Sequence, residues 1–293
     1  MSQTTISKIK SYGIIIKKIP ENIKSGILIN NYRWKIYGDF LCDNKDKYKI
    51  VFTSDIRDTF FQLDVFQFYN NYNSFLGVAI EDGILTDQIN KQWIINIYGL
   101  TIYEKIKNER IICSGTVWGT TDKFYEFSKM MWRPFEINRT LGRYIYDQGI
   151  ANYLIYYDKK FNDSLVKSDN INGRVMTVGL SNDKDIKFDS ENNVLNGKGE
   201  IAAVVHQYDR KPNIIEKVKR KYCYKWFFIH FFRLIMRFQP FLLFIMIFGI
   251  FIATFIIIKF LYDRKKKRKR TKIKIKKNFL KSDDKLVKIY NEI

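Results

Sequence analysis

The chain has 293 residues and a formal charge of +21, but this charge is concentrated near the C-terminus. Residues 216–293 hold 22 basic and 5 acidic residues, whereas residues 1–215 are nearly balanced, with 29 basic and 25 acidic. The balanced body excludes a domain that binds nucleic acid through a broad basic face, and 46% apolar residues exclude a disordered chain. Three widely spaced cysteines without a CxxC pair argue against a disulfide framework or a zinc site.

The first 215 residues alternate between short apolar runs and segments with helical spacing. The apolar runs predict strands at residues 48–53, 75–80, 110–113, 174–178 and 200–205. Helical spacing, with an aspartate at each start, predicts helices at residues 87–98, 122–132 and 147–157. Polar residues 181–199 predict a surface loop or hairpin. This order predicts an α/β fold with a mixed, mainly parallel sheet and flanking helices.

A long apolar stretch at residues 238–261 predicts a transmembrane helix. Its core, residues 241–258, has 18 residues without a charge, about 27 Å of helix at about 1.5 Å per residue. The alternative is a buried core helix. A basic, aromatic segment at 216–237 precedes the stretch, and a polybasic tail at 262–293 follows it and would attract anionic lipids. We expect a single-pass protein of the Golgi or ER with its tail in the cytosol, although basic residues flank both ends of the span.

Four polar motifs follow predicted strands or begin predicted helices, where ligands collect in α/β folds. In the first, SDIRD, Asp55 and Asp58 could both reach a divalent cation, and Arg57 could contact a donor phosphate. A turn and helix cap is the alternative. In the second, CSGT, Gly115 would let a ligand approach the backbone and Ser114 could bind a hydroxyl. Its alternative is an ordinary loop.

The other two motifs supply further candidate side chains. In DQGIAN, Asp147 and Gln148 could bind hydroxyls or act near a reacting carbon, unless Asp147 is a simple N-cap. In HQYDR, His206 could be a third ligand for a manganese-type ion and Arg210 could bind phosphate. A buried structural histidine is the alternative. Each motif alone is a weak signal.

Together, the order and spacing of the four motifs resemble nucleotide-diphospho-sugar transferases of the GT-A fold, distantly glycogenin and the galactosyltransferases. The resemblance extends to three flanking segments, RDTFFQLDVF, GTVWGTTDKF and AAVVHQYDR. It covers residues 31–212. It implies a metal site for Mn²⁺ or Mg²⁺ made by Asp55, Asp58 and His206. It implies that Ser114, Gly115 and Arg210 lie against the donor, and that Asp147 and Gln148 face the sugar or the acceptor and assist the chemistry.

Two departures from the family qualify this expectation. Only 54 residues precede Asp55, so the N-terminal nucleotide-binding part is shortened, and Ala151–Asn152 stands where the family has His-Asn. We expect residues 1–215 to form a membrane-anchored, metal-dependent glycosyltransferase domain. It would move a hexose from a nucleotide-diphosphate sugar to a hydroxyl of a glycan, lipid or protein acceptor, without a nucleic-acid partner. The alternatives are an inactive relative that binds or scaffolds, and a peripheral protein that binds lipid or nucleic acid through its tail.

Overall fold

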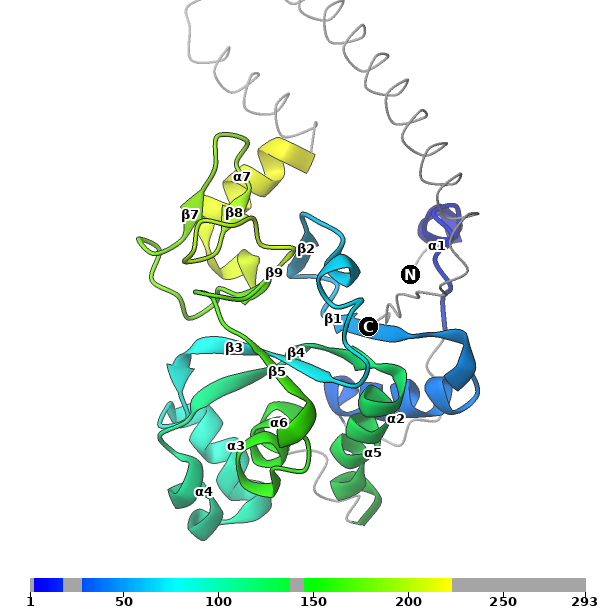
Figure 1. The fold of residues 1–293 in the computed structure, drawn as a ribbon, viewed down its shortest axis with the longest axis vertical. Helices are drawn as coiled ribbons and strands as arrows, with labels where there is room; N and C mark the ends of the chain where they lie inside the picture. The colour runs from blue at the N-terminus through cyan, green and yellow to red at the C-terminus, as the bar shows by residue number, and fades with distance from the viewer. Residues whose placement is uncertain (1–2, 18–27, 138–144, 223–293) are drawn as a thin grey trace, which may run out of the picture. The chain divides into compact units, whose positions relative to one another are not determined.

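A computed structural model describes residues 3–17, 28–137 and 145–222, which form a layered arrangement of helices and strands (Figure 1). The helices of this part of the chain are α1 (Gln3–Lys10), α2 (Ile29–Cys42), α3 (Gln88–Tyr98), α4 (Leu100–Ile106), α5 (Thr121–Ile137), α6 (Asp147–Tyr153) and α7 (Pro212–Tyr222). Its strands are β1 (Ile50–Ser54), β2 (Thr59–Phe61), β3 (Leu76–Ile84), β4 (Arg110–Thr120), β5 (Leu165–Ser168), β6 (Val175–Thr177), β7 (Lys187–Phe188), β8 (Val194–Leu195) and β9 (Val204–His206).

The predicted membrane span at 238–261 and the polybasic tail at 262–293 lie outside the described residues. Among the helices that are described, none is both long enough and apolar enough to cross a bilayer. The boundary between the two compact units of the chain falls after Ile215, so every strand named above belongs to the first unit.

A central sheet of four strands, in the order β1–β4–β3–β5, organises the fold. β4 runs antiparallel to both β1 and β3, and only β5 runs parallel to its neighbour β3. A second sheet has the order β2–β9–β6, in which β9 is antiparallel to β2 and parallel to β6. The strands β7 and β8 form an antiparallel pair within the predicted loop or hairpin. The mixed α/β class is confirmed, but the expectation of a mainly parallel sheet is wrong.

Two helices lie in each connection on either side of β4. α3 and α4 both lie between β3 and β4, and α5 and α6 both lie between β4 and β5. Gly99, at φ 80°, separates α3 from α4 in a backbone conformation that glycine adopts readily. The sequence analysis ended the predicted helix at residue 98, as in α3, and did not predict α4; its expectation of a mainly parallel sheet came from the alternation of strands and helices.

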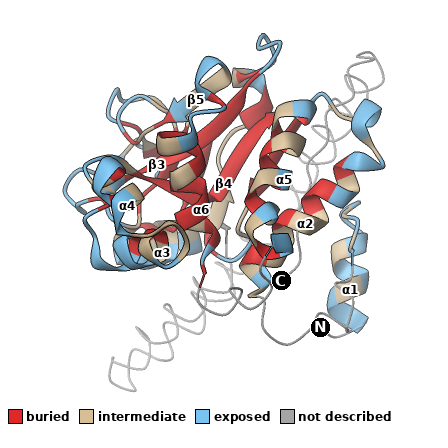
Figure 2. Ribbon diagram, turned by 90° about the horizontal axis from the view of Figure 1, so that it is seen from below, coloured by how far each residue is buried: buried red, intermediate tan, exposed pale blue. Residues whose placement is uncertain are grey.

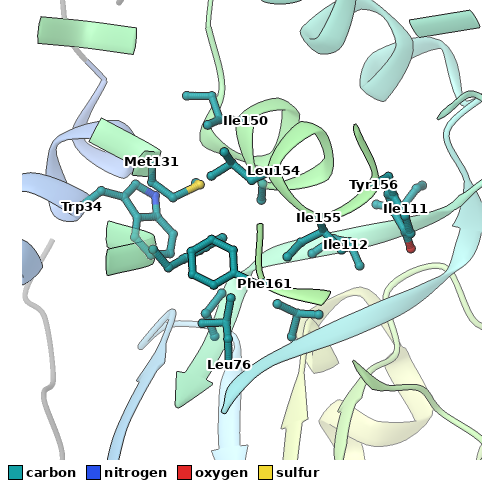
Figure 3. Close-up of a cluster of buried hydrophobic side chains, with 14 of the residues drawn as sticks. Trp34, Leu76, Ile111, Ile112, Met131, Ile150, Leu154, Ile155, Tyr156 and Phe161 are labelled. Carbon is teal, nitrogen blue, oxygen red and sulfur yellow. The ribbon is translucent and has the colours of Figure 1, made fainter. Parts of the chain in front are cut away.

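The central sheet is buried on both faces, because helices cover one face and the second sheet covers the other (Figures 1 and 2). On the helical side, Trp34 of α2 packs with Met131, Phe161 and Leu76 (Figure 3). Along β3, Val78 and Ile80 join this cluster, whereas Ala79 between them joins the cluster on the opposite face. Double burial also explains the long apolar β4, which the sequence analysis ended at Cys113 and continued as a loop.

Candidate metal centre and the buried network beside it

Asp55, Asp58 and His206 meet at one point of the fold although 148 positions separate Asp58 from His206. The two aspartates follow β1, and the pairing of β2 with β9 sets Thr59 opposite His206. Each of the three residues offers one ligand atom, and these atoms all lie within 4.8 Å of one another. Nε2 of His206 is 3.7 Å from an Asp55 carboxylate oxygen and 3.6 Å from one of Asp58. The structure thus brings together the three metal ligands that the sequence predicts.

Two of these ligand atoms are buried and make no hydrogen bond, although they face each other at 3.6 Å as an ion pair. Asp58 Oδ1 and His206 Nε2 have no hydrogen-bond partner in the described part of the chain, and the two residues are 6% and 1% exposed. Leaving buried polar atoms without a hydrogen bond costs free energy, so two such atoms at one point call for an explanation. Carboxylate oxygens and an imidazole nitrogen are ligands of divalent cations. The group could therefore hold a metal ion, and its two orphaned atoms fit that role.

Gly115 of β4 makes room for this group. A Cβ atom at this position would lie 2.4 Å from Cε1 of His206 and 2.8 Å from Oδ2 of Asp55. The backbone also fixes the site, because the Asp55 amide donates a hydrogen bond to the Gly115 carbonyl at 3.1 Å. The sequence analysis expected this glycine to admit a ligand to the backbone of a loop. In the structure it lies on a strand and admits the side chains of two candidate metal ligands.

The charges of the group are strongly coupled. Burial of the His206 ring lowers its pKa, but the neighbouring Cys113 and the Asp55 and Asp58 carboxylates outweigh burial and raise the pKa to about 10. Burial raises the pKa of Asp55, but His206 and the Arg33 guanidinium outweigh it and lower the pKa to about 2. Burial raises the pKa of Asp58. Without a bound cation, a charged His206 therefore balances the Asp55 carboxylate at neutral pH.

A second buried cluster, centred on Arg33 and Asp147, lies directly beside the first. Arg33 of α2 forms an ion pair with Asp55 and a second one with Asp147, at 2.6 Å. Arg33 also donates to the Ser114 carbonyl at 3.1 Å. Trp34 Nε1 donates to one Asp147 oxygen at 2.9 Å, and the Ser114 hydroxyl donates to the other at 3.1 Å. Both carboxylate oxygens of Asp147 are thus hydrogen-bonded within the protein.

Three of the predicted site residues, Asp147, Gln148 and Arg57, lie outside the metal group. Asp147 is the first residue of α6, but its side chain does not cap the helix. The N-cap position belongs to Tyr146, which makes no capping hydrogen bond with its side chain. Gln148 is half-buried and donates to Asn90 Oδ1 at 2.9 Å. Arg57 is exposed (86% of its side chain) and faces Asp209 at 3.7 Å.

Arg210 is also exposed, and one of its guanidinium nitrogens lies 3.0 Å from where a Cβ on Gly179 would stand. Arg57 and Arg210 are near Asp58 and His206 in sequence. They are therefore placed to supply positive charge at the surface next to the metal group rather than inside it.

The sequence analysis missed Arg33, which connects the two clusters. Its helix α2 carries Trp34, Tyr37, Gly38 and Leu41 on its buried side, at the spacing i, i+3, i+4 and i+7. That spacing is the signal that could have predicted the helix. An arginine next to such a buried stripe would then have been a candidate partner for a buried carboxylate.

Compared with known proteins, the chain matches no protein-family model and no curated protein. The resemblance to GT-A transferases therefore stays a prediction from the motifs.

Proposed function

We propose that residues 31–212 form a metal-dependent glycosyltransferase domain that moves a hexose from a nucleotide-diphosphate sugar to an acceptor hydroxyl. The observation that carries the proposal is that two buried atoms without a hydrogen bond, Asp58 Oδ1 and His206 Nε2, are grouped with Asp55 at ligand spacing. The four motifs, in their order along the sequence, support a nucleotide-diphosphate sugar as the donor.

In this proposal Asp55, Asp58 and His206 hold Mn²⁺ or Mg²⁺. Such an ion, when bound, stabilises the negative charge that develops on a leaving diphosphate. Arg57 and Arg210 lie exposed near these ligands in sequence, and their guanidinium groups suit phosphate oxygens. The chain's own contribution is thus to bind and orient the diphosphate end of the donor.

The Arg33 network suggests a supporting role for Asp147. Because both of its oxygens are already bonded, we propose that Asp147 acts by holding Arg33 and Ser114, and through Arg33 it orients Asp55. Gln148, which is half-buried, is the better candidate for direct contact with the sugar or the acceptor. We also propose that the acceptor is a glycan, a lipid or a protein, and that residues 238–261 anchor the domain in an endomembrane.

The test combines metal binding with donor turnover. Mn²⁺ is titrated into the full chain and followed by electron paramagnetic resonance, and hydrolysis of a panel of UDP- and GDP-sugars is then measured. We expect tight Mn²⁺ binding and turnover of one donor, with both lost in Asp55→Ala and His206→Ala. Asp39→Asn, which alters an exposed carboxylate on α2, is the control and should change neither. Unchanged Mn²⁺ binding or unchanged turnover in Asp55→Ala would defeat the assignment.

A second function, binding without catalysis, has one observation in its favour. Asp147 has no carboxylate oxygen free to act as a base, since Arg33, Trp34 and Ser114 occupy both. Calorimetry with the same donors and Mn²⁺ separates the two functions. Donor binding without turnover favours a binding or scaffolding role, and turnover favours the transferase.

A further inference from the structure

The two ring nitrogens of His206 have different surroundings. Nε2 faces the Asp55 and Asp58 carboxylates, whereas Nδ1 lies 3.3 Å from the sulfur of Cys113. Cys113 is on β4, is 1% exposed and is a free cysteine. The imidazole therefore stands between the candidate metal site and a buried thiol.

A metal site at Nε2 requires one particular tautomer. A neutral imidazole carries a single N–H, and the nitrogen that binds a cation must be the one without hydrogen. Nδ1 must then carry the hydrogen and needs an acceptor, which in a metal site is usually a carboxylate or a carbonyl. Here the atom at hydrogen-bond distance is the sulfur of Cys113.

For the neutral ring that a bound cation requires, the distances around Nε2 favour this tautomer. If Nε2 carried the hydrogen of a neutral ring, the nearest carboxylate oxygens, at 3.6 and 3.7 Å, would be too distant to accept it well. The donor would then be buried and unpaired. A bare Nε2 lone pair beside two carboxylates instead forms a set of ligands with space for a cation.

We infer that Cys113 is a positioning residue that fixes His206 in the tautomer able to bind a metal ion. The Nδ1–H of His206 donates to Cys113 Sγ, which leaves Nε2 free for the cation. This inference rests on the proposed metal site and adds the means by which the chain prepares it.

The tautomer can be read directly, since the chain has only two histidines, His206 and His230. In the full-length variant His230→Gln, labelled with ¹⁵N-histidine, His206 gives the only imidazole signals. Long-range ¹H–¹⁵N correlation spectra are recorded with saturating Mg²⁺, a hard ion with little affinity for the thiol. We expect a hydrogen on Nδ1 and none on Nε2. A hydrogen on Nε2 in the Mg²⁺-loaded protein would overturn the inference.

Mn²⁺ affinity measured by electron paramagnetic resonance tests the contribution of Cys113. Cys113→Ala removes the acceptor, and loss of such a partner typically weakens metal binding about 10–100-fold. Cys113→Ser keeps a group that both accepts and donates, so affinity should return to within about threefold of the original. Cys42→Ala, which alters the exposed free cysteine, is the matched control and should leave the affinity unchanged.

The outcomes separate the inference from the proposed function. If the unaltered protein binds no Mn²⁺ at all, the proposed function fails. If it binds Mn²⁺ and Cys113→Ala binds equally well, the inference alone fails. The urea unfolding midpoint of each metal-free variant distinguishes a change in affinity from a general loss of folding. If the Cys113 sulfur acted only by apolar packing, Cys113→Ser would not restore the affinity.

Discussion

Cys113 and Ser114 are neighbours on β4, yet they point to opposite faces of the central sheet and serve two polar clusters of different character. Ser114 belongs to the Arg33–Asp147 network, in which the buried ion pairs are closed by hydrogen bonds within the protein. Cys113 contacts His206 in the metal group, the open cluster, where two buried atoms make no hydrogen bond. The comparison teaches that the closed cluster satisfies its own polar atoms, whereas the open cluster leaves atoms that could hold a metal ion.

The largest expected effect concerns the closed cluster. Arg33→Met leaves the buried carboxylate of Asp147 without its countercharge and should lower the free energy of unfolding by about 3–5 kcal/mol. Urea denaturation of the metal-free protein measures this change. Arg57→Met is the control because that side chain is exposed, and its effect should stay within about 0.5 kcal/mol. Equal stability of the two variants would mean that the network does not support the fold.

A smaller effect is expected where the two clusters come closest, at Gly115. In Gly115→Ala the new methyl group collides with His206, which should cost about 1–3 kcal/mol of stability and weaken Mn²⁺ binding at least about tenfold. Gly38→Ala on α2 is the matched control, since its new methyl group meets only the Ser128 hydroxyl, at 3.3 Å, and alanine favours a helix. Thermal unfolding and Mn²⁺ titration check both variants. Normal Mn²⁺ binding by Gly115→Ala would contradict the geometry described for the site.

The open cluster predicts a dependence on pH. The folded, metal-free protein holds a proton on His206 up to pH about 10, above the ordinary value of 6.5, so charged His206 stabilises the fold fully below pH 6.5 and loses this effect as the pH rises through about 10. A cation must displace that proton, so Mn²⁺ affinity should rise about tenfold per pH unit between pH 7 and 9. Calorimetry in two buffers of different ionisation enthalpy should show about one proton released per ion. Affinity that is constant over this range would mean that metal binding displaces no proton from His206.

The smallest effect on stability should come from Asp58, in contrast to Arg33. Burial raises the pKa of Asp58, so its charged form is disfavoured in the fold, and Asp58→Asn should leave the metal-free protein unchanged or up to about 1 kcal/mol more stable. Added Mn²⁺ should stabilise the unaltered protein, as any ligand of the native state does, but not this variant. Urea denaturation with and without Mn²⁺ measures both. A large loss of stability without Mn²⁺ would place Asp58 with the closed cluster instead.

The open cluster was the more predictable of the two from sequence. Asp55 and Asp58 follow the strand β1 and His206 ends the strand β9, and chemically distinctive residues at strand ends are a recognisable pattern. The three residues could therefore be predicted as one group, and the structure places them together.

The closed cluster and the strand directions could not be read in the same way. Arg33 reaches Asp147 across 114 positions, and no local pattern specifies which carboxylate a buried arginine will meet. Several strands and helices were predicted near their observed positions, but α2, α4, β2 and β5 were not. Strand direction depends on how distant strands pair, which local patterns do not specify.

The pairing of β2 with β9 has a consequence for synthesis of the chain. At roughly 5–20 residues per second, His206 leaves the ribosome about 7–30 s after Asp58. During that interval Asp55 can already meet Arg33, which is made earlier, so the aspartate has a countercharge before its histidine partner exists. The arginine thus gives the nascent polypeptide a lasting countercharge for an acidic residue whose second neighbour arrives near the end of translation of the domain.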